Sequence, residues 1–198
     1  MDNRVVWLTG LSGAGKTTIA LAAADRFGCE VLDGDTIRDF FSNTDFSREG
    51  RERHLLGVAR MAKMISKHTP VLCSFITPYE DVRLKILEIL PDNAVMAHVS
   101  TSLEVCEERD AKGLYAKARS GEISNFTGIT DPFDAPECAH LTLDSSGEEG
   151  KSVSELVDQL AHLFEKSKGV LLPGRWQPLH VGHEWLIQQE LDQGKRVI

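Results

Sequence analysis

The chain has 198 residues, of which 41% are hydrophobic and 26% charged, and this composition is typical of a globular protein with one well-filled core. Its formal net charge of −8 argues against a broad nucleic-acid-binding surface, because such a surface needs clustered Lys and Arg. No apolar run approaches the roughly 20 residues that span a bilayer, and the amino terminus lacks a signal-peptide pattern. We therefore expect a soluble, cytoplasmic protein that binds neither nucleic acid nor membranes.

Apolar runs bounded by turn residues alternate with segments of helical period along the chain. In chain order we expect a strand at 5–9, a helix at 16–27, a strand at 30–32, a helix at 48–67, a strand at 70–75, a helix at 79–90, a strand at 94–99, a helix at 102–112, a strand at 141–143 and a helix at 152–166 with a Ser cap. Residues 113–136 fit neither period and predict a long ordered loop of the kind that forms lids. The alternation predicts an α/β fold, a doubly wound parallel sheet of about five strands with helices on both faces.

A phosphate-binding pattern follows the first expected strand. Residues 10–17 read GLSGAGKT and fit G-x-x-x-x-G-K-S/T between a strand and a helix. Glycines let successive backbone N–H groups point at phosphate oxygens, and the following helix adds the positive end of its dipole. Lys16 would reach the β- and γ-phosphates, and Thr17 would give a hydroxyl to Mg²⁺. The strand and helix in register disfavour a chance glycine-rich turn, so we predict a P-loop NTPase fold that binds ATP and Mg²⁺.

An acidic segment follows the second expected strand, at the sheet edge where ligands of doubly wound folds bind. A carboxylate of Asp33 or Asp35 there could take the proton of an acceptor hydroxyl or hold Mg²⁺ through water, and Arg38 could pair with an acceptor anion. The alternative is a D-G turn that caps the next helix. The phosphate-binding loop favours the functional interpretation.

Several further segments make the chain resemble the adenylylsulfate kinases over residues 4–164. They are GLSGAGKTT at 10–18, DGDTIR at 33–38, FS at 46–47 with Arg51, SFITPY at 74–79, LEVCEERD at 103–110, KGLYAKAR at 112–119, GEI at 121–123 and NFTGI at 125–129. The resemblance implies transfer of the ATP γ-phosphoryl group to the 3′-hydroxyl of adenylyl sulfate, which gives 3′-phosphoadenylyl sulfate and ADP in sulfate assimilation. We also expect a homodimer.

The same resemblance implies roles for individual residues. Those for ATP are Gly10, Ser12, Gly13, Ala14, Gly15, Lys16, Thr17, Thr18 and Arg109. Those for the acceptor are Asp33, Asp35, Arg38, Phe46, Arg51, His54, Ile76, Leu114 and Phe126. The implied catalytic residues are Lys16, Asp33, Asp35, Thr77, Lys112 and Lys117, and Thr17 and Asp35 would serve the metal. Lys112, Lys117 and Arg119 of the expected lid would bring positive charge to the γ-phosphate while water is excluded.

The chain departs from the usual pattern of that family mainly on the acceptor side. The departures are Gly50 for an acid, His54 for an asparagine, Leu56 and Gly57 for two arginines, Thr77 for a serine and Glu80 for an arginine. They leave open a pocket for another nucleotide-linked anion, such as a cytidine diphosphate derivative. They also leave open a nucleotide-binding regulatory module without catalysis. A nucleotide-state switch is disfavoured, because the sequence has no N-K-x-D motif.

The pattern restarts after Lys168, so we expect a kinase domain at 1–168 and a truncated second domain at 169–198. Residues 174–183 read GRWQPLHVGH and resemble the first strand, turn and H-x-G-H signature of nucleotidylyltransferases, in which His180 and His183 would stabilise charge on an α-phosphate. A metal site and an ordinary turn are the alternatives. The resemblance implies fusion to a nucleotidylyltransferase domain in the full-length protein.

Overall fold

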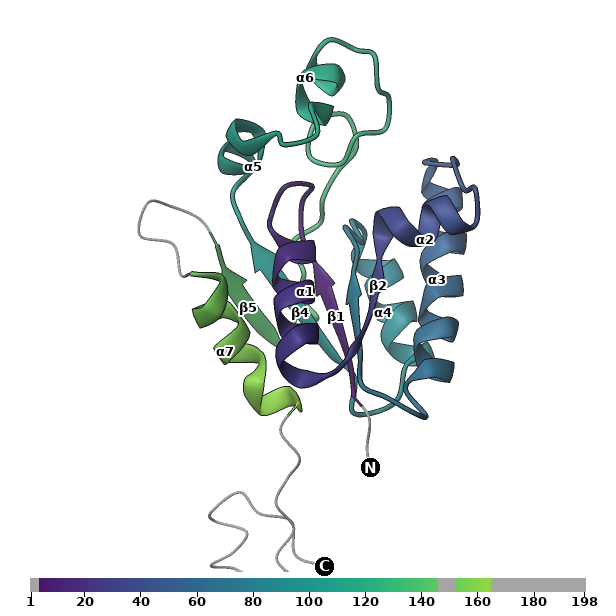
Figure 1. The fold of residues 1–198 in the computed structure, drawn as a ribbon. Coiled ribbons are helices and arrows are strands. Elements are labelled where there is room, and N and C mark those ends of the chain that lie inside the picture. Colours follow the sequence, from purple (N-terminus) through teal and green to yellow (C-terminus); the bar gives the residue numbers. More distant parts are fainter. Residues whose placement is uncertain (1–3, 146–151, 165–198) are drawn as a thin grey trace, which may run out of the picture. The chain divides into compact units, whose positions relative to one another are not determined.

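The computed structural model describes residues 4–145 and 152–164, and Figure 1 shows their arrangement. The elements are β1 (Val5–Thr9), α1 (Lys16–Phe27), β2 (Glu30–Asp33), α2 (Gly34–Phe40), α3 (Arg48–Ile65), β3 (Val71–Ser74), α4 (Glu80–Ile89), β4 (Val95–Ser100), α5 (Leu103–Arg109), α6 (Leu114–Arg119), β5 (Leu141–Asp144) and α7 (Val153–Phe164). All five expected strands form, and the expected second domain at 169–198 lies outside the described residues.

The five strands form one parallel sheet in the order β2-β3-β1-β4-β5. Strand β1 therefore lies in the middle, paired with β3 from Val5 opposite Val71 and with β4 from Val6 opposite Val95. A parallel pair needs a crossover, and here helices supply the crossovers on both faces. This topology confirms the predicted doubly wound α/β fold.

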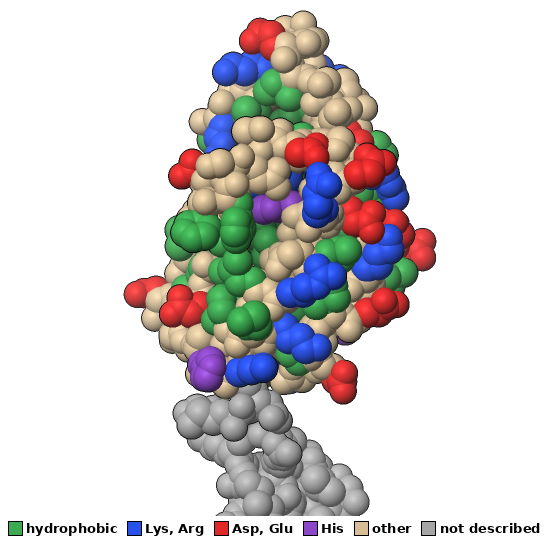
Figure 2. Space-filling model, turned by 90° about the vertical axis from the view of Figure 1, so that its right-hand side faces the viewer, with side chains coloured by type: hydrophobic (Ala, Val, Ile, Leu, Met, Phe, Trp, Pro, Cys, Tyr) green, Lys and Arg blue, Asp and Glu red, His purple; other side chains and the backbone are tan. Residues whose placement is uncertain are grey.

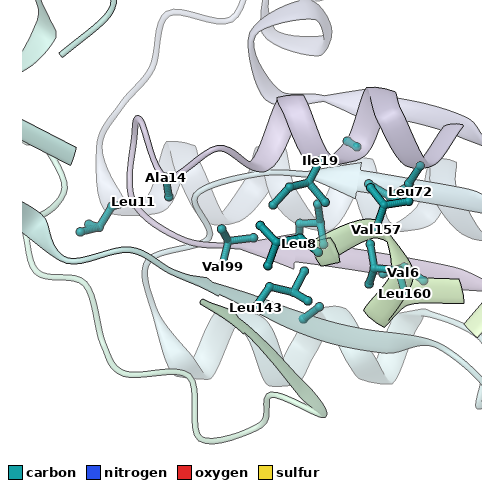
Figure 3. Close-up of a cluster of buried hydrophobic side chains, with 14 of the residues drawn as sticks. Val6, Leu8, Leu11, Ala14, Ile19, Leu72, Val99, Leu143, Val157 and Leu160 are labelled. Carbon is teal, nitrogen blue, oxygen red and sulfur yellow. The ribbon is translucent and has the colours of Figure 1, made fainter. Parts of the chain in front are cut away.

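The two faces of β1 enter two separate clusters of buried hydrophobic side chains. Val6 and Leu8 pack against α1 and α7, in a cluster that includes Ile19 and Leu160 (Figure 3). Trp7, on the opposite face, packs with residues of α3 and α4, and its ring stacks on Phe75 at a centroid distance of 5.2 Å. Successive side chains of a strand point to opposite faces, so a strand with an unbroken apolar run is buried on both sides.

Two helices were not expected from the sequence. Helix α2 begins at Gly34, the second residue of the D-G pair, and helix α6 lies inside 113–136, so the expectation of an uninterrupted loop there is wrong at 114–119. Both are short, with seven and six residues, and α2 has no buried residue that would give it an apolar period. The expected Ser cap of α7 is confirmed, because Ser152 and Glu155 form a reciprocal capping box.

The outer face of α3 and α4 carries charge of both signs. Figure 2 shows Lys and Arg beside Asp and Glu over this face, with hydrophobic side chains gathered on one half of it. Ion pairs join α3 to α4, from Arg48 to Asp81 and from Lys85 to Glu52. Among the residues that the structure describes, no helix is long and apolar enough to cross a bilayer.

The carboxyl ends of β1, β2 and β3 meet at one edge of the sheet (Figure 1). The phosphate-binding loop leaves β1 there, Asp33 ends β2 and Ser74 ends β3. Helices α5 and α6 and the loops around them lie beyond the same edge, as Figure 1 shows. In parallel α/β sheets this edge is where ligands bind, next to the strand at which the chain changes direction.

Candidate active site

The phosphate-binding loop connects β1 to α1 with its backbone curled. Gly15 precedes α1 in a left-handed conformation, φ 93°, which a residue with a side chain rarely adopts. Two hydroxyls hold the loop in place, because Thr101 and Ser145 both donate to the carbonyl of Ala14, at 3.1 and 2.9 Å. The resulting loop places its N–H groups at the start of a 12-residue helix, where anions bind favourably.

Lys16 is the buried cation of this loop. Its side chain donates to the carbonyl of Leu11 at 2.7 Å, and the residue is only 8% exposed. Burial lowers the pKa of Lys16 to about 8, and the opposing attraction of nearby acidic groups is smaller. A buried ammonium that has lost hydration gains strongly from a phosphate oxygen, so this side chain is well suited to the charge that develops in phosphoryl transfer.

Three oxygen-bearing side chains meet where the loop faces β2 and β3. Thr17 donates its hydroxyl to Oδ2 of Asp33 at 2.7 Å, and its Oγ1 lies 3.3 Å from the hydroxyl of Ser74. The other oxygen of Asp33 accepts from the N–H of Asp35 and so caps α2. The capping interpretation of this segment is therefore confirmed, and its functional interpretation stays a prediction. A hydroxyl and a carboxylate are hard oxygen donors, which fit Mg²⁺.

Asp35 faces a different partner. Its carboxylate is paired with the ammonium of Lys112, which lies between α5 and α6. Both side chains are largely exposed, so the pair adds little stability by itself. It does bring Lys112 to the start of α2, which directly follows β2.

A cavity of about 540 Å³ extends from the phosphate-binding loop to α2 and α3. The predicted site residues that line it are Ser12, Gly13, Gly15, Lys16, Thr17, Thr18, Asp33, Asp35, Arg38, Phe46, Arg51, His54, Ile76, Thr77, Arg109 and Lys112. The lining also includes Leu55, Ser74 and Phe75, which the sequence did not single out. Ser74 had a signal, because it is a polar residue at the carboxyl end of a buried strand.

The end of the cavity next to α2 and α3 is built around Phe46, which is about half exposed. The guanidinium of Arg38 lies over its ring at 4.4 Å from the centroid, and that of Arg51 lies at 5.6 Å. Arg51 also donates to the carbonyls of Phe46 and Asn125, which ties α3 to the segment after α6. An exposed ring flanked by two cations can stack a flat base and attract its anionic substituent.

His54 forms part of the cavity wall on α3. It is 8% exposed, its ring lies 6.2 Å from that of Phe75, and its Nε2 has no hydrogen-bond partner among the described residues. Burial, and to a smaller degree the positive charge of Arg38, lower the pKa of His54 to about 4. The imidazole is therefore neutral near pH 7 and offers a hydrogen bond without a charge.

The structure does not bring every predicted residue to this cavity. Phe126 is buried against Tyr115, with ring centroids 4.9 Å apart, and Leu114 packs at the border of the same cluster. Lys117 is exposed, and Arg119 is held by both carboxylate oxygens of Glu107. Gly10 and Ala14 belong to the phosphate-binding loop but do not line the cavity.

Helices α5 and α6 are attached to the phosphate-binding loop by contacts that the sequence did not reveal. The hydroxyl of Tyr115 in α6 donates to the carbonyl of Ser12 at 2.9 Å. Arg109 of α5 donates to the carbonyls of Gly13 and Ser145, at 3.4 and 2.8 Å. Residues on α5 and α6 therefore hold the loop from the side opposite to α2 and α3.

A family model described as adenylylsulphate kinase matches residues 2–144. The chain belongs to this family. An adenylyl-sulfate kinase of Shewanella baltica (strain OS155) is 45% identical over 166 residues, 79% of this chain and 80% of that protein. A "probable adenylyl-sulfate kinase" of Aeropyrum pernix is 45% identical over 177 residues, 84% and 93% of the two chains. The structure of the Mycobacterium tuberculosis APS kinase CysC in complex with AMPPNP and APS superposes with a TM-score of 0.76 at 32% identity, over 83% of this chain and 99% of that chain.

Most of the departures from the adenylylsulfate kinase pattern lie outside the cavity. Glu80 pairs with Arg83, which is fully buried, and accepts from the N–H of Cys138 at 2.8 Å, so its place is structural and not in the acceptor pocket. Leu56 packs at the border of the core, and Gly57 is exposed. Thr77 and His54 alone among these departures line the cavity. The hydroxyl oxygen of Thr77 accepts from the indole N–H of Trp7 at 2.9 Å.

Proposed function

We propose that this chain transfers the γ-phosphoryl group of ATP to the 3′-hydroxyl of adenylyl sulfate. The observation that carries the proposal is the single cavity that joins Lys16 and Thr17 at one end to Arg38, Phe46 and Arg51 at the other. Phosphoryl transfer needs donor and acceptor held in line in one site with positive charge around the moving group. Membership of the adenylylsulfate kinase family supports the choice of acceptor.

The donor end would act mainly through charge. The backbone N–H groups of the phosphate-binding loop and the ammonium of Lys16 bind the β- and γ-phosphates, and Lys112 adds a second cation at the acceptor side. Thr17 and Asp33 would hold Mg²⁺, directly or through water, and the ion would neutralise charge on the phosphates. Asp33 takes the place of Asp35 in the predicted metal pair, because Asp35 is paired with Lys112 whereas Asp33 contacts Thr17. Asp33 or Asp35 would accept the proton of the attacking hydroxyl.

The acceptor end would recognise a flat base that carries an anion. Phe46 offers a ring face to the adenine, and the guanidiniums of Arg38 and Arg51 attract the phosphate and sulfate oxygens. Neutral His54 would give one hydrogen bond to the base or the sulfate. Phe126, Leu114 and Lys117 would reach the acceptor only through movement of the segment after α5, and their roles stay predictions.

An acceptor screen with radiolabelled ATP tests the proposal. We expect label transfer, and ADP release, that depend on both adenylyl sulfate and Mg²⁺ and that stop when EDTA is added. Transfer to another nucleotide-linked anion, such as a cytidine diphosphate derivative, with none to adenylyl sulfate would show that the acceptor is wrong. Tight ATP binding without transfer to any acceptor would indicate a regulatory module. The homodimer and the fusion to a nucleotidylyltransferase stay predictions, which light scattering and the full-length gene product would test.

A further inference from the structure

The segment between α2 and α3 carries Phe46, and Asp45 is the residue that fixes it. The backbone N–H of Asp45 donates to the side chain of Asn43 at 3.0 Å, and its carbonyl accepts from Arg38 at 3.2 Å. One carboxylate oxygen accepts from the N–H and the hydroxyl of Ser47, at 3.0 and 2.6 Å. Phe46 therefore lies between two residues that are hydrogen-bonded to each other, and these bonds restrain the backbone that presents its ring to Arg38.

The contacts of Asp45 continue into α3. Ser47 is the N-cap of this helix and accepts from the N–H of Gly50 at 3.1 Å. The second carboxylate oxygen of Asp45 pairs with Arg53 at 2.8 Å. The hydrogen bonds from the hydroxyl and the N–H of Ser47 lower the pKa of the Asp45 carboxyl, so it is ionised throughout the neutral range.

Gly50 leaves the room that this carboxylate occupies. A Cβ at position 50 would overlap the carboxyl carbon and both carboxylate oxygens of Asp45. Gly50 is itself buried in the first turn of α3, where glycine is an unfavourable helix residue. A glycine at position 50 is therefore explained by its neighbour, because the Asp45 carboxylate fills the volume that any side chain at position 50 would occupy.

We propose that Asp45 and Gly50 act as a matched pair in which Asp45 is the positioning residue for Phe46 and Arg38 at the acceptor end of the cavity. Asp45 does not itself line the cavity, so it acts through these two residues. The inference rests on the proposed function for its choice of acceptor. It predicts that Asp45 governs acceptor binding, while ATP binding, which depends on residues around α1, is independent of it.

Kinetics of four variants test the pair. Asp45→Ala should raise KM for adenylyl sulfate about tenfold, because charge-assisted hydrogen bonds are lost, with KM for ATP and kcat changed by less than about twofold. Arg53→Ala is the matched control and should have no such effect, since its ion pair with Asp45 is exposed. Gly50→Ala should raise the same KM in the native background and add nothing in an Asp45→Ala/Gly50→Ala double variant.

Amide hydrogen exchange gives a readout that does not depend on the acceptor. In Asp45→Ala and in Gly50→Ala, the amides of residues 43–50 should exchange faster, and those of α1 should stay as in the native protein. Unchanged exchange at 43–50 in Asp45→Ala, or an equal effect of Gly50→Ala with and without Asp45, overturns the proposal. Failure of the native protein to use adenylyl sulfate would refute the proposed function instead, and the exchange results would still decide the role of Asp45.

Discussion

The hydroxyl of Thr17 donates to the carboxylate of Asp33 at 2.7 Å, and this hydrogen bond connects the first turn of α1, which follows β1, to the end of β2, a strand that does not pair with β1. Strand β3 lies between β1 and β2, and Ser74 at its end is 3.3 Å from the same hydroxyl. The first residues of α1 and the carboxylate that ends β2 are thus held at a fixed separation. A phosphoryl donor and a phosphoryl acceptor that bind on either side of this hydrogen bond would therefore be held at a fixed distance from each other.

Asp33→Asn is expected to reduce kcat by more than about 100-fold, because the amide neither accepts a proton nor attracts a metal as a carboxylate does. The helix cap survives, since Asn caps as well as Asp, so the free energy of unfolding should change little. Steady-state ADP release and urea unfolding measure the two quantities. Asp39→Asn on the exposed side of α2 is the control, and equal loss of activity in both variants would contradict the role of Asp33.

Lys16→Ala is expected to lower kcat/KM by about 100-fold or more, which corresponds to a loss of several kcal/mol of transition-state stabilisation. The physical reason is the loss of the only side-chain cation within the phosphate-binding loop itself, residues 10–17. The circular dichroism spectrum of the variant should stay native. Exposed Lys63→Ala on α3 should behave like the native protein. Native activity in Lys16→Ala would remove the basis for phosphoryl transfer at this loop.

His54 should make the protein sensitive to acid. Its pKa is about 4 when folded and near 6.5 when unfolded, so the unfolded state binds more protons in between. Stability should therefore fall as the pH drops from about 6.5 towards 4, and His54→Asn should lose less stability over that interval. Urea unfolding at several pH values measures this, with exposed His68→Asn as the control. Parallel profiles for native protein and His54→Asn would contradict a neutral, buried imidazole.

The same variant tests the acceptor contact. With His54 neutral, KM for the acceptor should show no step from this group between about pH 6 and 8. If His54→Asn lowers KM for adenylyl sulfate, an amide serves the acceptor better than the imidazole does. If it abolishes turnover, the imidazole itself selects the acceptor.

Glu80→Gln should reduce stability by about 3 kcal/mol without changing KM for either substrate, because it leaves the buried guanidinium of Arg83 without its carboxylate. Burial by itself raises the pKa of Glu80, but the hydrogen bonds from Arg83 and Cys138 outweigh it and lower that pKa. The stabilisation by ionised Glu80 is therefore fully present above about pH 4.3, the pKa of an unfolded Glu. It is lost as the pH falls through the lower pKa that Glu80 has in the folded protein. Unfolding curves of native protein and variant should converge in acid.

Glu88→Gln, an exposed residue of the same helix, is the control for that measurement. A normal stability combined with a raised KM for the acceptor would place Glu80 in the acceptor pocket, as a comparison of sequence patterns alone suggested. In the structure, Glu80 is instead one of the partners that hold the buried guanidinium of Arg83. Arg83 also donates to the carbonyls of Thr77 and Asp134.

Strand β1, the glycine-rich turn and α1 were predicted well from the sequence, because each is determined by residues that are close together in the chain. An unbroken apolar strand, a glycine-rich turn and a helix define 5–27, and the structure has β1 and α1 at the expected bounds. Helix α2 was missed, because seven exposed or half-exposed residues carry no period. Phe126 was predicted to bind the acceptor and its burial was not predicted, because whether an aromatic ring joins the core depends on a partner, here Tyr115, that comes near only when the chain folds.

The order of the strands determines where in this protein a substitution disturbs the core and where it does not. Strand β1, which leads into the phosphate-binding loop, is buried at every residue and bordered on both sides, whereas β2 is an edge strand of the sheet and is partly exposed. A substitution in α2, which has no buried residue, leaves both hydrophobic cores intact, whereas one in β1 disturbs two cores at once. New acceptor preferences can therefore arise at the border of the sheet in small steps, each of which leaves the use of ATP untouched.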